Sequence, residues 1–228
     1  MIKQNLVVFD IDGTITDSVQ IHQEAFIKAL LKLGVPQHQP DDQPQLNTFK
    51  HHTDSYIART IFETYTDLTF DQKLLKKFEV ELHRDLLKHQ ISEIKGAIKF
   101  IQYLQHETNF GICFATGSLL QPAIHKLNAI GLPFDENLLV AANNIWDRES
   151  IINQAIDQSK LHHGQNDFKR IISIGDGLWD LKAAQNLGLE FIGIGAQNKI
   201  DFLENEVRYI ADDFSEFIKP EIIALFHG

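Results

Sequence analysis

Short apolar runs recur along the chain, and patterns typical of helices separate them. The runs are rich in Val, Ile and Phe, as buried strands are, and they lie at residues 6–9, 111–115, 138–141, 170–175 and 191–194. Apolar residues recur at helical spacing between them, at residues 94–105, 120–130, 148–158 and 178–186. Continuous apolar strands that alternate with helices predict an α/β fold, with a doubly wound parallel sheet covered by helices on both faces.

The stretch at residues 18–90 breaks this alternation. It shows no convincing strand, and its apolar residues form three successive stripes at helical spacing. This pattern predicts an all-helical domain inserted after the first strand, while residues 1–17 and 91–228 form one core. We expect the two connections between the parts, near Asp17-Ser18 and near Ile91-Ser92, to act as hinges.

Composition narrows the class of protein. A chain of 228 residues fits one core with a sizeable insertion. The formal net charge of −10 disfavours nucleic acid and anionic membranes as partners. The first apolar run is too short for a signal peptide or a membrane span, so we expect a cytoplasmic protein. The single cysteine, Cys113, lies in an apolar run, which indicates a core position.

Acidic and hydroxyl side chains follow three of the predicted strands. They lie in Asp10–Thr14, in Thr116–Ser118 and in Gly175–Gly177, and Asp180 comes shortly after the last of these. In an open parallel sheet, ligands bind beyond the carboxyl ends of the strands. Carboxylate and hydroxyl oxygens that converge there form the kind of site that suits Mg²⁺.

The most informative pair is Asp10 and Asp12. Residues two apart on a departing strand point to similar sides, so these carboxylates repel unless a cation neutralises them. An ionised carboxylate can attack phosphorus, and its neighbour, with a raised pKa, can hold a proton for the leaving oxygen. Two aspartates in a solvated turn would show the same spacing, so the pair alone does not decide the chemistry.

Three segments together resemble a known family. Residues 7–18, Val-Val-Phe-Asp-Ile-Asp-Gly-Thr-Ile-Thr-Asp-Ser, resemble the first motif of the haloacid dehalogenase-like phosphatases. Residues 114–118, Phe-Ala-Thr-Gly-Ser, are similar to the second motif, and residues 175–180, Gly-Asp-Gly-Leu-Trp-Asp, to the fourth. Order and spacing also match over essentially the whole chain. The resemblance implies a Rossmann-like core with a helical cap, as in phosphoglycolate phosphatase and β-phosphoglucomutase.

The third motif departs from the family pattern. The family generally has a lysine at the start of a helix, and the best match here is residues 146–150, Trp-Asp-Arg-Glu-Ser. We therefore expect Arg148 to take the role of that lysine, since its forked guanidinium can also grip a phosphate. Lys160 is the alternative, but it lies too close to Asp176 in the sequence.

The resemblance implies a role for each matching residue. Asp10 would be the nucleophile, and Asp12 the general acid and then base. The implied Mg²⁺ ligands are the side chains of Asp10 and Asp176 and the backbone carbonyl of Asp12. Asp180 would either support the metal site from just outside the direct ligands or pair with Arg148. Catalytic contacts to the phosphoryl group would come from Thr116 and Arg148, within a phosphate-binding set of Ile11, Asp12, Thr116, Gly117 and Arg148.

Polar residues of the predicted cap are candidates for substrate specificity. They are His22, His52, Tyr56 and Arg59, although a solvated helix face would have the same composition. The function expected from the resemblance is Mg²⁺-dependent hydrolysis of a small-molecule phosphate monoester. Asp12 favours this over dehalogenation, because a halide needs no acid to leave. The alternatives are a phosphomutase and, from another class, a signalling module that is merely phosphorylated, although receiver domains are shorter and lack a cap.

Overall fold

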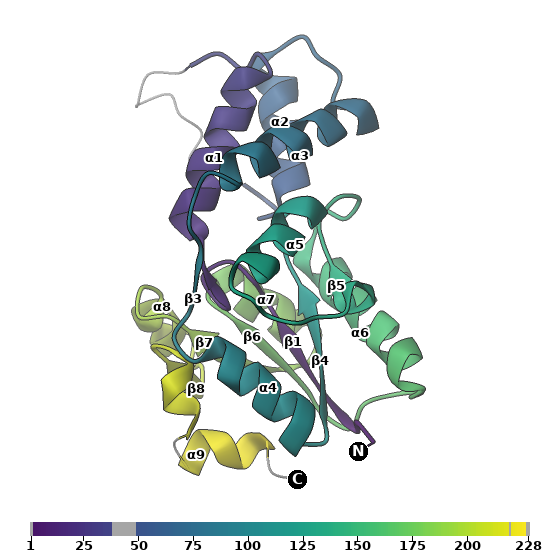
Figure 1. The fold of residues 1–228 in the computed structure, drawn as a ribbon, viewed down its shortest axis with the longest axis vertical. Helices are drawn as coiled ribbons and strands as arrows, with labels where there is room; N and C mark the ends of the chain where they lie inside the picture. Colours follow the sequence, from purple (N-terminus) through teal and green to yellow (C-terminus); the bar gives the residue numbers. More distant parts are fainter. Residues whose placement is uncertain (1, 38–48, 219, 227–228) are drawn as a thin grey trace.

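The core is a six-stranded parallel sheet. The computed structural model describes residues 2–37, 49–218 and 220–226. The strand order of the sheet is β5-β4-β1-β6-β7-β8 (Figure 1). The strands are β1 (Asn5–Phe9), β4 (Phe110–Ala115), β5 (Leu139–Val140), β6 (Ile171–Gly175), β7 (Glu190–Ile194) and β8 (Tyr209–Ala211). The five expected strands all belong to this sheet, which confirms the predicted α/β class, and β8 is an addition.

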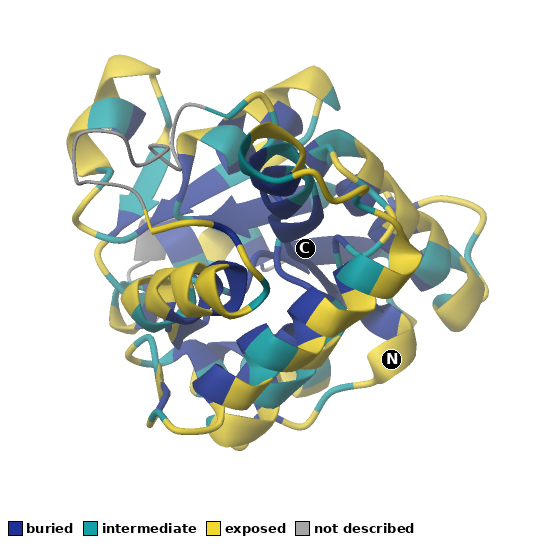
Figure 2. Ribbon diagram, turned by 90° about the horizontal axis from the view of Figure 1, so that it is seen from above, coloured by how far each residue is buried: buried dark blue, intermediate teal, exposed yellow. Residues whose placement is uncertain are grey.

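Helices cover both faces of the sheet because alternate strand residues point to opposite sides. Val7 and Phe9 pack with α4 (Ala97–Glu107) and α5 (Leu120–Ala129). Leu6 and Val8 pack with the helices of the other face, α6 (Arg148–His163) and α7 (Leu178–Asn186), and Cys113 is buried on that face. Figure 2 shows the buried strands in the centre with exposed helix surfaces around them. Smaller elements complete the core: η3 (Glu136–Leu138), α8 (Lys199–Glu204), η4 (Phe214–Ile218), α9 (Pro220–Ile223) and η5 (Ala224–Phe226).

The register of the central strands brings their carboxyl ends level. Phe9, the last residue of β1, pairs with Phe114 on β4 and with Ile174 on β6. The residues that follow these positions therefore leave the sheet at the same edge. This edge faces the three cap helices, which lie in the upper part of Figure 1.

The cap has a hydrophobic cluster of its own. Its helices are α1 (Val19–Lys32), α2 (Asp54–Tyr65) and α3 (Gln72–Leu86). Phe26 of α1 meets Phe78 of α3 edge to face, with ring centroids 4.9 Å apart. The separate cluster fits an inserted domain over residues 18–90, of which residues 38–48 lie outside the described part of the chain. None of the helices within the described ranges is long and apolar enough to cross a membrane.

The chain crosses between core and cap through a two-stranded ribbon. Strand β2 (Thr16–Asp17) pairs antiparallel with β3 (Ser92–Glu93), so that Thr16 faces Glu93 and Asp17 faces Ser92. The two connections expected to act as hinges thus lie side by side and pair with each other.

The start of α2 is docked on the core. The Asp54 amide donates to the Gly117 carbonyl at 2.8 Å, and the Leu119 amide donates to Oδ2 of Asp54 at 3.0 Å. Oγ1 of Thr53 donates to the Trp146 carbonyl at 2.8 Å. These contacts hold the cap against the strand ends.

A second contact fastens α3. The buried carboxylate of Glu79 accepts from the Gln121 amide at 3.1 Å and from Nδ2 of Asn143 at 3.0 Å. Both α2 and α3 are therefore bonded to the core near the start of α5.

Candidate active site

A glycine turn places the first motif against the fourth. Gly13 adopts a φ of +75°, which strongly favours glycine. A Cβ there would lie 2.1 Å from Oδ2 of Asp176, so the residue must lack a side chain for Asp176 to approach. The turn leaves Asp10 at the end of β1, where its amide donates to the Ile174 carbonyl at 2.9 Å.

Three carboxylates converge at this edge. Asp10, Asp176 and Asp180 each offer an oxygen within 4.8 Å of the others. Asp10 and Asp180 are buried, and Nη2 of Arg148 lies 2.7 Å from Oδ1 of each. One guanidinium therefore faces three acidic groups.

Burial, together with this crowding, shifts the pKa values of the three aspartates upward. Burial raises the pKa of Asp10 to about 7, the charges of Asp180 and Asp12 add to the effect, and Arg148 opposes it. Burial and the charge of Asp10 also hold the pKa of Asp176 well above its usual range. Burial likewise raises the pKa of Asp180. Three hard oxygen donors with too little positive charge beside them fit a divalent cation such as Mg²⁺.

Arg148 begins α6, where the Asp147 carboxylate caps the helix by accepting from the Ser150 amide at 2.7 Å. Burial alone would lower the pKa of Arg148, but the charges of Asp180 and Asp10 raise it above its ordinary value. Its Nε and Nη1 are buried and have no hydrogen-bond partner among the described residues. Two donors thus remain for an anion.

Lys160, the alternative cation, lies elsewhere. Its Nζ is 3.4 Å from Asp167 and 3.7 Å from Asp157, near the far end of α6. The structure brings Arg148 and not Lys160 to Asp10.

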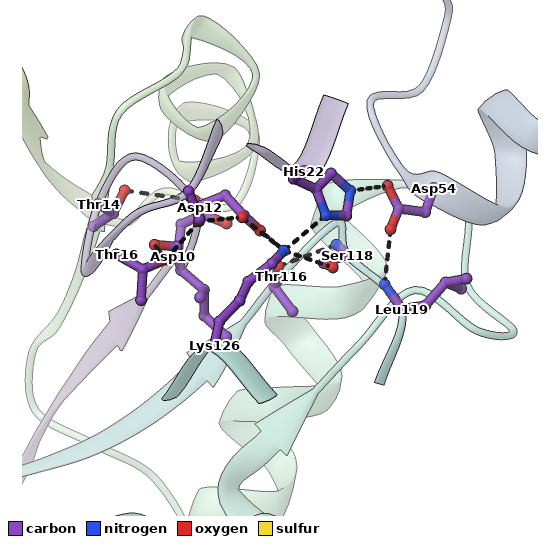
Figure 3. Close-up of polar contacts among 12 residues, drawn as sticks. Asp10, Asp12, Thr14, Thr16, His22, Asp54, Thr116, Ser118, Leu119 and Lys126 are labelled. Carbon is purple, nitrogen blue, oxygen red and sulfur yellow. Dashed lines mark hydrogen bonds and ion pairs between the residues drawn. The ribbon is translucent and has the colours of Figure 1, made fainter. Parts of the chain in front are cut away.

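Asp12 has very different neighbours (Figure 3). Nζ of Lys126 lies 2.6 Å from its Oδ1 and 2.7 Å from its Oδ2, and Oγ of Ser18 donates to Oδ1 at 2.5 Å. Burial would raise the pKa of Asp12, but the charge of Lys126 and the hydrogen bonds from Lys126 and Ser18 lower it to about 2. The expectation of a raised pKa at Asp12 is therefore wrong for this conformation. The raised pKa belongs to Asp10, because Asp10 shares the Arg148 guanidinium with two other carboxylates, whereas Asp12 has the Lys126 ammonium to itself.

The expected phosphate-binding residues surround a cavity of about 320 Å³. Thr116 is buried and its Oγ1 accepts from the Ser118 amide at 3.1 Å. Gly117 must be glycine here, because a Cβ would lie 2.5 Å from the His52 carbonyl oxygen. The cavity lining includes Asp10, Asp12, Thr116, Gly117, Arg148 and Asp176. Ile11, the other expected phosphate-binding residue, is buried in the hydrophobic core and is not among the lining residues, and its carbonyl accepts from Oγ1 of Thr16 at 3.2 Å.

The four cap candidates separate into two pairs. His22 and His52 line the cavity, and His52 also stacks on Trp179 of the core with ring centroids 4.7 Å apart. Tyr56 and Arg59 do not line it. They face Trp146 instead, with the Arg59 guanidinium 4.8 Å from its ring centroid and the Tyr56 ring 6.0 Å away.

Sequence reasoning missed two residues of the site, Lys126 and Asn198. Ser18, Ser118 and Trp179 lay within the quoted motifs but were given no role of their own. Lys126 is the most consequential, because it is fully buried and holds Asp12. One signal was present in the sequence. Lys126 lies between Ala123 and Leu127 on the buried face of α5, where an apolar residue is expected.

A comparison with protein families agrees with this geometry. Residues 7–194 match the model of the haloacid dehalogenase-like hydrolases, a range that includes all four motif regions and the cap. The chain belongs to this family. No curated protein matches it in sequence.

Solved structures share the fold of this haloacid dehalogenase-like hydrolase at low sequence identity. CbbY from Rhodobacter sphaeroides, in complex with xylulose-(1,5)bisphosphate, aligns at a TM-score of 0.73 and 16% identity over 96% of this chain and 97% of that one. β-Phosphoglucomutase from Clostridium difficile aligns at a TM-score of 0.69 and 17% identity, over 100% of this chain and 97% of that one. A predicted phosphoglycolate phosphatase from Haemophilus somnus aligns at a TM-score of 0.62 and 17% identity, over 96% of this chain and 98% of that one. The TM-scores show a common fold, and at these identities the likeness extends to the fold alone.

Proposed function

We propose that this protein hydrolyses a small-molecule phosphate monoester in a Mg²⁺-dependent reaction that passes through an aspartyl-phosphate on Asp10. One observation carries the proposal. Arg148 holds Asp10 through Nη2, and its Nε and Nη1 have no partner in the part of the chain that the structure describes. The three carboxylates of the cluster lie beside it, next to a cavity. A phosphate in that cavity would find the nucleophile and its charge-stabilising donors together.

The reaction has two halves. A carboxylate oxygen of Asp10 attacks phosphorus, and the ester oxygen leaves with a proton from Asp12. Asp12 then takes a proton from water, whose oxygen attacks phosphorus and breaks the bond to Asp10, so that inorganic phosphate is released. Thr116 and the Gly117 amide would bind the phosphoryl oxygens.

The acidic cluster would hold the metal. Asp10, Asp176 and the backbone carbonyl of Asp12 are the proposed ligands, with Asp180 either a ligand or the partner that orients Arg148. Bound Mg²⁺ would supply positive charge that offsets the crowded carboxylates and the phosphate.

The cavity favours hydrolysis over phosphoryl transfer between positions of one sugar. A mutase must hold a second phosphate, and Arg148 is the only lysine or arginine in the described lining of the Asp10 cavity. The size of about 320 Å³ suits a small ester. The sugar bisphosphate bound by CbbY supports a phosphorylated metabolite as the substrate class.

A phosphomutase is the second candidate because of one adjoining feature. A larger cavity of about 740 Å³ contains Lys50 and Lys182 and shares His52, Arg148 and Trp179 with the first. A second phosphate would have to reach these lysines. The two candidates differ in their products, since a mutase returns an isomeric sugar phosphate without net release of phosphate.

The test is phosphate release from a panel of phosphate monoesters and p-nitrophenyl phosphate, with Mg²⁺ and with EDTA. We expect turnover only with Mg²⁺, together with a phosphoryl group trapped on Asp10 after acid quench. Full activity in EDTA would contradict the metal assignment. Conversion of a sugar phosphate to its isomer without phosphate release would select the mutase.

A further inference from the structure

Lys126 is a fully buried cation in the middle of α5. Its ammonium has three hydrogens to donate and meets three acceptor groups. They are the Asp12 carboxylate at 2.6–2.7 Å, Nδ1 of His22 at 2.9 Å and Oγ of Ser118 at 3.1 Å. A buried ammonium with every hydrogen satisfied has one orientation, so its partners are held in place as well.

The acceptors belong to three separate parts of the molecule (Figure 3). Asp12 follows β1, Ser118 belongs to the loop after β4, and His22 lies on α1 of the cap. Asp12 and His22 are 114 and 104 positions away from Lys126 in sequence. Lys126 therefore joins the expected proton-transfer residue to the cap.

The chain of contacts continues through the cap and returns to the core. Because Nδ1 of His22 accepts from Lys126, its Nε2 carries the hydrogen in the neutral ring and donates to Oδ1 of Asp54 at 2.9 Å. Oδ2 of Asp54 accepts from the Leu119 amide at 3.0 Å. This circuit closes only when α1 and α2 are docked, as they are in this structure.

We propose that Lys126 is a positioning residue for the reaction, which fixes the Asp12 carboxylate for proton transfer and, through His22, makes that position depend on cap docking. The proposal rests on the proposed function, because it presumes that Asp12 moves the proton. Lys126 is not among the residues that line the cavity, so it acts through Asp12 and not on the substrate.

The leaving group provides a readout that a merely structural lysine would not change. An alkoxide needs a proton in order to leave, whereas p-nitrophenolate leaves without one. The ratio kcat/KM covers the steps up to formation of the phosphoryl-enzyme, so it isolates the step in which Asp12 acts as an acid. Hydrolysis of the phosphoryl-enzyme needs Asp12 as a base with either substrate.

The experiment compares Lys126→Met with the wild type on an alkyl phosphate and on p-nitrophenyl phosphate. We expect kcat/KM to fall about 10²-fold for the alkyl ester, at the lower end of general acid contributions, and much less for the aryl ester. A burst of p-nitrophenol should appear, because the phosphoryl-enzyme accumulates. The matched control is Lys99→Met, which removes an exposed lysine from α4 and should leave kcat/KM unchanged for both substrates.

His22→Gln tests the link to the cap and remains available if Lys126→Met does not fold. The value of kcat/KM for the alkyl ester, divided by that for the aryl ester, should fall by a smaller factor than in Lys126→Met. We expect a fall on the order of tenfold, because only one of the three acceptors of Lys126 is altered. Melting temperatures report the folded state of each variant. A parallel fall for both substrates in the folded variants, or no change in the ratio, overturns the positioning role. Absence of phosphate release from any ester by the wild type would instead overturn the proposed function.

Discussion

Asp10 and Asp12 leave the same strand two residues apart, but the groups around them differ in charge. Around Asp10, three carboxylates share the guanidinium of Arg148, and the pKa of Asp10 rises to about 7. Around Asp12, one carboxylate faces the ammonium of Lys126, and its pKa falls to about 2. The Asp10 half of the site has one cation for three carboxylates, while in the Asp12 half the charge of one carboxylate is balanced by Lys126 of α5.

This difference shows what each half requires before it can react. The nucleophile must be ionised, so the Asp10 half needs a cation, and the hard oxygen donors there suit Mg²⁺. The general acid must hold a proton, so the pKa of Asp12, which is low in this structure, must rise before Asp12 can act as an acid. A phosphate dianion beside Asp12 would do this, because a nearby negative charge raises the pKa of a carboxyl group.

The largest expected effect comes from replacing the nucleophile. Asp10→Asn should lower kcat by more than ~10³-fold, because an amide does not attack phosphorus. It should not lower the melting temperature, since it removes one of three repelling carboxylates. Asp17→Asn, an exposed residue of the same segment, is the control and should behave as the wild type in both assays. Residual activity above about a tenth would refute the covalent route.

Replacing Arg148, the cation that faces the crowded carboxylates, is expected to have the second-largest effect. Arg148→Ala should lower kcat by about 10²-fold or more, because the phosphate loses preorganised donors. Arg148→Lys keeps the charge without the fork and should fall between this variant and the wild type. Lys160→Ala is the control, because its partners are Asp157 and Asp167. The reverse ranking of Arg148 and Lys160 would show that the third motif was assigned to the wrong residue.

Metal binding should depend on pH in a stated direction. A carboxyl pKa raised by folding contributes stability that is present at low pH and is lost as pH rises through about 7, the pKa of Asp10. Mg²⁺ must displace the proton below that pH, so its affinity should fall by up to about tenfold per pH unit below 7. The measurement is the rise in melting temperature on adding Mg²⁺, which should be larger at pH 8 than at pH 6. An equal rise at both would contradict the raised pKa of Asp10.

The smallest effect concerns the cap side of the cavity. His52→Ala should change kcat/KM for a preferred phosphate ester severalfold and leave p-nitrophenyl phosphate nearly unchanged, because a small generic substrate barely touches the cap. Tyr56→Ala and Arg59→Ala are the comparison, since both residues contact Trp146 outside the cavity. If these variants alter selectivity more than His52→Ala does, the specificity surface lies outside this cavity.

The sheet and the strand-end residues could be predicted because both depend on local pattern. The helix expected at residues 178–186 has those bounds in α7, and Asp10 and Asp176 meet because parallel strands end at one edge. Strand β8 was missed because its apolar run, Tyr209–Ala211, has only three residues, fewer than the roughly four to eight that mark a strand in a sequence, and two of them are half-exposed.

The other half of the site could not be predicted, for a physical reason. Lys126 meets Asp12 and His22 only after the sheet has formed and the cap has docked, and no spacing along the chain encodes that meeting. The direction taken by Tyr56 and Arg59 depends in the same way on how α2 lies against the core. A helical pattern defines a face of a helix, but the partner of that face is a property of the tertiary structure.

The ribbon of β2 and β3 makes the whole cap, in topological terms, the loop of a β-hairpin. Its two ends pair with each other at Asp17 and Ser92, so the core is closed at that point whatever lies between them. Loop-closure entropy grows slowly with length, by only about 0.6 kcal/mol for each doubling. A longer, shorter or unrelated insert could therefore replace the cap at little cost to the sheet. The residues at the strand ends would keep their arrangement, and the substrate specificity could change when one continuous segment of the chain is exchanged.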